Sequence, residues 1–221
     1  MKLELKNVSK TFGENEIIKN VSLSMSSGKI YGFIGRNGSG KSVLLKIICG
    51  FYTPTSGTIL LDNENYIEKN SFPKNTRALI EKPNFLPDLT GFENLKLLAS
   101  IQNKIGTEEI NKILEELNLS EEKNKKYSKY SLGTKQKLGI AQVLMEDPSL
   151  IILDEPFNGV ESETVNKIRN LLIEEKKKDK IIIIASHIKE DIELMADVVY
   201  QVDNGIVKEV PKERPNKKVK R

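Results

Sequence analysis

A single cysteine and the lack of long hydrophobic runs exclude several classes of protein at once. Cys49 has no partner for an intramolecular disulfide, and the N-terminus has no apolar stretch typical of a secretory signal. Both features favour a reducing, cytoplasmic compartment. The longest apolar runs, at 30–34, 150–153 and 181–185, fall far short of the roughly 18 residues that cross a bilayer. We therefore expect any action at a membrane to require another chain.

Excess positive charge is confined to the C-terminal segment. The 221 residues contain 35 Lys+Arg and 31 Asp+Glu, a net charge of +4. Residues 212–221 alone hold six basic residues and one acidic residue, so the rest of the chain is close to neutral. Nucleic-acid-binding proteins usually carry a basic face on the folded body, so we expect no nucleic-acid partner. The tail, 211–221, is expected to be a solvated terminus, with attraction to anionic lipid as the alternative.

The pattern of apolar residues predicts an α/β protein. A strand at 29–34, a glycine-rich loop and a helix at 43–49 follow one another directly. A more polar, helix-rich region at about 89–144 looks inserted, and the two continuous apolar runs after it indicate a buried parallel sheet. The other expected elements are strands around 3–8, 17–23 and 58–61, a strand at 150–153, a helix at 161–178, a strand at 181–185, a helix at 188–195 and a terminal hairpin at 198–207.

The segment 35–42, GRNGSGKS, matches the pattern G-x-x-x-x-G-K-S at every defined position. Glycines let backbone N–H groups turn inward around phosphate oxygens, and the following helix presents its positive end. In this pattern Lys41 neutralises the β- and γ-phosphates, and the Ser42 hydroxyl binds Mg²⁺.

Two acids follow the apolar strand at 150–153. The carboxyl ends of parallel strands border the ligand crevice, so Asp154 and Glu155 are expected near the glycine loop. Asp154 then suits Mg²⁺ coordination, and Glu155 suits the role of general base on an attacking water. His187 directly follows the next strand, where its imidazole could bind a γ-phosphate oxygen.

Taken together, these motifs resemble the nucleotide-binding ATPase subunit of an ABC transporter over about residues 1–210. The resemblance implies a P-loop NTPase fold of the ABC type, with a mainly parallel core sheet, an N-terminal antiparallel β subdomain and an inserted α-helical subdomain at about 89–144. It matches 35–42 to Walker A, 150–155 to Walker B and His187 to the switch histidine.

The resemblance also assigns residues to ATP and to the metal. Phe12 lies where the family stacks an aromatic ring on adenine, with a buried sheet residue as the alternative. Ser131 and Gly133 lie in the signature block, YSLGTKQ, where Leu132 and Thr134 depart from the usual LSGGQ. Glu81 replaces the glutamine that usually contacts Mg²⁺. The expected ATP-binding residues are Phe12, Gly35, Arg36, Asn37, Gly38, Ser39, Gly40, Lys41, Ser42, Val43, Ser131 and Gly133; the expected metal ligands are Ser42, Asp154 and Glu81; and the expected catalytic residues are Glu155, His187 and Lys41.

The function implied by this resemblance is ATP hydrolysis that powers a transporter. ATP and Mg²⁺ are the expected cofactors. A second ATPase subunit, identical or related, would pair head to tail with this one, and polytopic membrane subunits would hold both at the inner face of the cell membrane. The combination of IEKP at 80–83 with the signature block is similar to the bacitracin and lantibiotic self-protection branch, whose exporters remove peptide antibiotics.

Three other functions stay open at the level of sequence. A non-transport ABC-type ATPase acting on the ribosome or DNA usually carries two cassettes or a long coiled-coil insert, and neither is seen here. A P-loop kinase or GTPase would leave the signature block, Phe12 and His187 unexplained. A purely regulatory ATP-binding module would differ by having no turnover.

Overall fold

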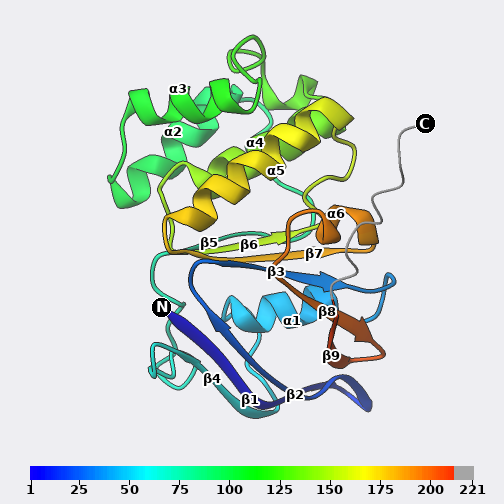
Figure 1. The fold of residues 1–221 in the computed structure, drawn as a ribbon. Coiled ribbons are helices and arrows are strands. Elements are labelled where there is room, and N and C mark those ends of the chain that lie inside the picture. The colour runs from blue at the N-terminus through cyan, green and yellow to red at the C-terminus, as the bar shows by residue number, and fades with distance from the viewer. Residues whose placement is uncertain (212–221) are drawn as a thin grey trace, which may run out of the picture.

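The computed structural model describes residues 1–211, so the basic segment 212–221 lies outside the described part of the chain. The described elements form layers (Figure 1). An antiparallel sheet lies at one side, a larger sheet crosses the middle, and a group of helices covers the far side. No helix within residues 1–211 is both long and apolar enough to span a membrane.

The smaller sheet has the strand order β2-β1-β4 and is antiparallel throughout. β1 (Lys2–Phe12) and β2 (Asn15–Ser26) form a hairpin in which Phe12 pairs with Asn15. Gly13 in the connecting turn has a φ of +58°, a value that glycine adopts without steric cost. β4 (Ser56–Leu61) pairs with the other edge of β1.

The larger sheet has the order β5-β6-β7-β3-β8-β9. Its parallel strands are β3 (Lys29–Ile34), β5 (Thr76–Leu79), β6 (Leu150–Asp154), β7 (Ile181–Ser186) and β8 (Val198–Asp203), and β9 (Ile206–Val210) pairs antiparallel to β8. Every residue of β6 and β7 is buried. The continuous apolar runs thus form central strands covered on both faces.

The helices divide between the two faces of this sheet. α1 (Lys41–Ile48) lies between the two sheets, as Figure 1 shows. On the opposite face lie α4 (Leu132–Leu144) and α5 (Ser162–Lys177), with α2 (Gly91–Gln102) and α3 (Thr107–Glu116) beside them. A 3₁₀ turn (Tyr127–Lys129) precedes α4, and α6 (Lys189–Glu193) follows β7.

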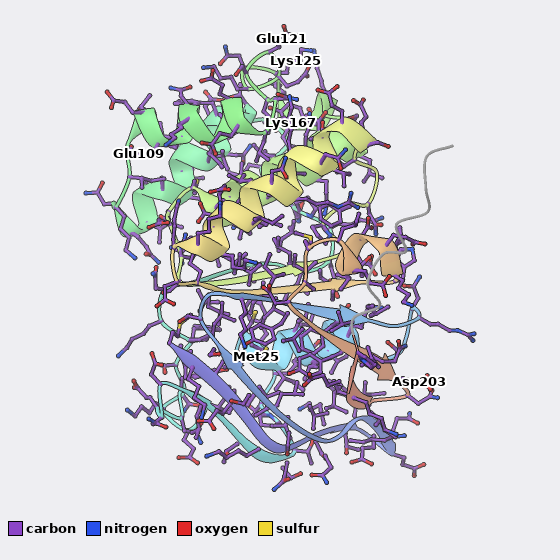
Figure 2. The ribbon with its side chains drawn as sticks, in the orientation of Figure 1. Met25, Glu109, Glu121, Lys125, Lys167 and Asp203 are labelled. Atoms are coloured by element: carbon purple, nitrogen blue, oxygen red, sulfur yellow. The ribbon has the colours of Figure 1, made fainter. Side chains whose placement is uncertain are left out.

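Two apolar cores result, one on each face, because side chains alternate along a strand. In β6, Ile151 and Leu153 join the core under α4 and α5, whereas Leu150 and Ile152 join the core around α1. The second core also holds Met25 of β2, which is fully buried between the sheets (Figure 2). The same alternation directs the residue after Leu153 toward α1.

Three elements differ from the sequence-based expectation. The strand β5 was not among the expected elements, since its sequence TRAL is short and half polar. The helix α4 was not separated from the helix-rich region around it. The helix expected at 188–195 is shorter, because Ile188 is in extended backbone conformation and only residues 189–193 are α-helical.

Candidate functional site

The loop between β3 and α1 carries the glycine-rich motif. Gly35 directly follows β3 and packs closely against the backbone of Val202 and the hydroxyl of Ser39. A Cβ atom at this position would collide with both. Gly40 has a φ of +107° immediately before α1 begins at Lys41. Both glycines are therefore required by the backbone path. The loop brings the N-terminal end of α1 to the carboxyl edge of the sheet, where an anion would be bound.

Lys41 lies folded inside this loop. Its ammonium donates hydrogen bonds to the carbonyl oxygens of Gly35 (2.6 Å) and Arg36 (3.1 Å), and it is 3.9 Å from a carboxylate oxygen of Glu155. Burial lowers the pKa of Lys41, while the charges of Glu155 and Asp154 act in the opposite direction. A buried cation surrounded by backbone dipoles is suited to hold a phosphate group.

The remaining loop residues surround this lysine. Ser39 is buried, and its hydroxyl has no hydrogen-bond partner among the described residues. The residues Arg36, Asn37 and Gly38 are exposed at the loop's outer side, and Ser42 and Val43 are half-buried in the first turn of α1.

Asp154 ends β6 on the face of the sheet that α1 covers. It is 4% exposed, and its Oδ1 atom has no hydrogen-bond partner in the described part of the chain. Burial raises the pKa of this carboxyl, with a further contribution from the charges of Glu155 and Glu81, whereas a hydrogen bond with Ser42 lowers it. An unpaired carboxylate oxygen beside a serine hydroxyl is a fitting ligand pair for Mg²⁺, which prefers oxygen ligands.

This pair does not form a complete cage for a metal. Within residues 1–211, no cluster of three or more His, Cys, Asp or Glu side chains could hold an ion. Mg²⁺ in nucleotide sites is commonly bound through one or two protein oxygens together with water and substrate phosphates. The donor set of Ser42 and Asp154 fits a metal that arrives with a nucleotide.

Glu155 is held in place by the end of the neighbouring strand β7. Its carboxylate accepts hydrogen bonds from the backbone N–H of His187 (3.0 Å) and the hydroxyl of Ser186 (3.3 Å), and His187 Nδ1 lies 2.8 Å from Glu155 Oε2. Gln136 donates to the Glu155 carbonyl oxygen (3.1 Å). The φ of Glu155 is +48°, which is uncommon for a residue other than glycine and is often found at functional sites.

Glu81 follows β5, the strand next to β6. It also has a left-handed backbone, with a φ of +64°. Its side chain is 63% exposed and forms an ion pair with Lys46 of α1. The structure thus places Glu81 within electrostatic reach of Asp154, but with a lysine as its partner.

Phe12 lies at the turn end of the β1–β2 hairpin, where it pairs with Asn15. It is 41% exposed, so the alternative of a buried sheet residue is wrong. Its ring meets that of Tyr52 edge to face, with 5.3 Å between centroids, and the Lys10 ammonium is 4.9 Å from its centroid. One exposed aromatic ring supported by a second is suited to stacking against a planar base.

Ser131 and Gly133 form a separate part of the surface. Ser131 caps α4 by accepting a hydrogen bond from the Thr134 N–H (3.1 Å), and a Cβ on Gly133 would collide with the carbonyl oxygen of Gly159. They line a small cleft with Thr134, Lys137, Gly159, Val160, Glu161 and Thr164, and no residue of the 35–42 loop belongs to its lining. The structure therefore brings Lys41, Ser42, Asp154, Glu155 and His187 together but leaves Ser131 and Gly133 apart.

Four contacts at the site were not foreseen from the sequence. They involve Ser186, Gln136, Tyr52 and Lys46. Ser186 was signalled by its position between the apolar strand and His187, and Gln136 by its place in the signature block. Lys46 and Tyr52 belong to no motif, and only the packing of α1 against the strand ends and of the loop at Tyr52 against Phe12 brings them to the site.

Comparison with known proteins agrees with this geometry. Residues 18–158 match the family model described as ABC transporter. The chain is 39% identical over 211 residues to the bacitracin transport ATP-binding protein BcrA of Enterococcus faecalis, covering 94% of this chain and 68% of BcrA. It is 32% identical over 203 residues to the lantibiotic transport ATP-binding protein SrtF of Streptococcus pyogenes, covering 92% and 87% of the two chains.

Solved structures show the same fold. An ATP-binding subunit of an ABC transporter superposes with a TM-score of 0.84 at 25% identity, covering 95% of this chain and 90% of that one. A bacterial ABC transporter cassette solved as a dimer gives 0.83 at 26% identity, covering 95% and 99%. The predicted fold class and its branch of relatives are confirmed. The chain belongs to the ABC transporter family, as an ATP-binding and ATP-hydrolysing subunit.

Proposed function

We propose that the chain hydrolyses Mg-ATP at the carboxyl edge of its larger sheet, with Glu155 as the general base. The observation that supports this most is the position of Glu155: its carboxylate is oriented by Ser186 and His187 and lies 3.9 Å from the ammonium of Lys41. The phosphate chain would lie in the loop at 35–42, which places the terminal phosphate between Lys41 and Glu155. ATP hydrolysis by this subunit therefore has a base, a cation and an anion cradle in one place.

The residues of the site have separate roles in binding the nucleotide and in hydrolysis. Lys41 exchanges its carbonyl partners for phosphate oxygens and offsets their charge. Ser42 and Asp154, with Glu81 beside them, would hold Mg²⁺, which neutralises charge on the phosphates when bound. Glu155 accepts a proton from water at its carboxylate, and His187 keeps that carboxylate aimed while its ring faces the γ-phosphate. Phe12, supported by Tyr52, stacks on the adenine.

A second subunit would complete each site. Ser131 and Gly133 lie at the N-terminal end of α4 and line a cleft to which no residue of the 35–42 loop contributes. The solved cassette dimer is a similar protein. Head-to-tail pairing of two subunits, identical or related, brings this helix end against the γ-phosphate held by the partner. ATP would then hold the dimer together, and hydrolysis would release it.

The relatives support a proposal for the transport partner and its cargo. The two named relatives serve bacitracin transport and lantibiotic transport. By analogy, this chain would work with polytopic membrane subunits at the inner face of the membrane and drive the export of a peptide antibiotic. A cleft lined by Glu81, Lys82, Pro83, Asn84, Tyr127, Leu132 and Lys135 reaches from Glu81 to the start of α4, and it would transmit the nucleotide state between them.

Replacing Glu155 by glutamine tests the catalytic assignment. Glutamine keeps the shape of the side chain and can still form hydrogen bonds with His187 and Ser186, but it cannot accept the proton of the attacking water. ATP turnover should therefore fall by at least about a hundredfold. ATP binding should persist, and a dimer should accumulate in ATP during size-exclusion chromatography. The exposed substitution Glu163→Gln on α5 is the control. Wild-type turnover in Glu155→Gln would contradict the proposal.

A further inference from the structure

Lys46 is a charged residue of α1 that no motif includes. It lies in the last turn of the helix, with a side chain only 22% exposed, and its ammonium pairs with the carboxylate of Glu81. This hydrogen-bonded ion pair raises the pKa of Lys46, so the ammonium stays charged throughout the physiological range. The pair joins α1 to the segment after β5.

Glu81 is close enough to the metal site to influence it. The strands β5 and β6 are parallel neighbours in which Leu79 pairs with Leu153. Asp154 is the last residue of β6 and Glu81 lies two residues beyond β5, so both are at adjacent strand ends. The charge of Glu81 contributes to the raised pKa of Asp154. A carboxylate at this position can therefore attract a divalent cation held by Asp154.

The ammonium of Lys46 also lies near the ring of Tyr52. The Nζ atom is 5.6 Å from the centre of the Tyr52 ring, a distance at which a cation is attracted to an aromatic face. If Glu81 turned toward a metal, the ammonium would keep this contact. The same lysine can thus release Glu81 without losing every favourable interaction.

We infer that Lys46 and the metal ion compete for the Glu81 carboxylate, so that Lys46 sets the metal affinity of the ATP site. Lys46 is then a positioning residue: it neutralises a glutamate at the place where the family usually has a neutral glutamine. The inference rests on the proposed function, in which Glu81 lies beside the metal bound to Ser42 and Asp154.

The test measures Mn²⁺ affinity by electron paramagnetic resonance, on the full chain with a non-hydrolysable ATP analogue. Lys46→Met should tighten Mn²⁺ binding about two- to fivefold, since a partly exposed ion pair contributes at most about that factor. Lys46→Arg retains the charge and should leave the affinity unchanged. In a Glu81→Gln background, Lys46→Met should give no measurable tightening, because no carboxylate remains to be released.

The other outcomes distinguish a failure of the competition between Lys46 and the metal from a failure of the proposed metal site. Unchanged affinity in Lys46→Met, or equal tightening with Glu81 and with Gln at this position, would overturn the competition. Ser42→Ala and Asp154→Asn must weaken Mn²⁺ binding; if they do not, the proposed metal site itself fails. Thermal melting of each variant verifies folding, and Lys46→Gln replaces Lys46→Met if the latter does not fold.

Discussion

Glu155 and Glu81 show how single residues at this site accept unfavourable local conformations. Both have positive φ angles, +48° and +64°, just beyond adjacent strands. Residues with a Cβ atom avoid the left-handed backbone region, and such a strained conformation persists only where surrounding contacts hold it. For Glu155 those contacts are the hydrogen bonds from His187 and Ser186, and for Glu81 the ion pair with Lys46.

Asp154, the proposed metal ligand, should lower folding stability when no metal is bound. Burial raises its pKa, so at pH 7 the native state bears the cost of a buried charge that the unfolded chain does not. Asp154→Asn should therefore raise the melting temperature measured without nucleotide, and each 1 kcal/mol gained in unfolding free energy corresponds to about 2–4 °C in a chain of this size.

Differential scanning calorimetry measures this effect. Asp203→Asn is the matched control, since Asp203 also ends a strand but is exposed (Figure 2). It should leave the melting temperature unchanged. A lower melting temperature for Asp154→Asn would show that the carboxylate stabilises the fold.

At the scale of elements, the sequence predicts best where local signals agree. The hairpin of β1 and β2, the loop before α1 and the apolar strands β6 and β7 follow from turn residues and apolar runs. β5 lacked such a signal, because its four residues are fixed as a strand by pairing with β6 rather than by their own preference. α4 was hidden in the helix-rich region, although Ser131 is a favourable N-cap residue.

The N-terminal end of α4 gives a prediction that separates capping from ATP contact. Ser131→Ala removes the acceptor for the Thr134 N–H and should cost about 1 kcal/mol in unfolding free energy. Ser131→Asp retains a capping oxygen, so stability should stay within a few tenths of a kcal/mol of wild type. Its negative charge should nevertheless repel the partner's γ-phosphate.

Urea denaturation measures the first effect and size-exclusion chromatography the second. In the Glu155→Gln background, Ser131→Asp should abolish the ATP-dependent dimer despite normal stability. A dimer of undiminished amount would place the signature block away from the phosphate.

At the scale of the whole molecule, the larger sheet separates two cores and carries the site at its edge. Ile151 and Ile152 are adjacent and fully buried, yet they belong to opposite cores. Ile151→Ala and Ile152→Ala should each lower the unfolding free energy by about 2–5 kcal/mol, because each leaves a cavity in a packed interior.

Urea denaturation of the two variants tests this arrangement. Ile206→Ala, at a position 46% exposed, is the control and should cost much less. A cost below about 1 kcal/mol for either buried isoleucine would mean that one face of the sheet is not packed.

The sequence by itself determined which residues gather at the site, since the glycine spacing of 35–42, the acids after an apolar strand and His187 after the next are local patterns with few alternatives. It could not decide which side chains pair across elements. Three contacts join residues 19 to 40 positions apart in the sequence: Lys46 with Glu81, Tyr52 with Phe12, and Gln136 with the Glu155 carbonyl. Such contacts depend on how α1, α4 and the strand ends pack around the sheet, and local pattern carries no information about distances through space.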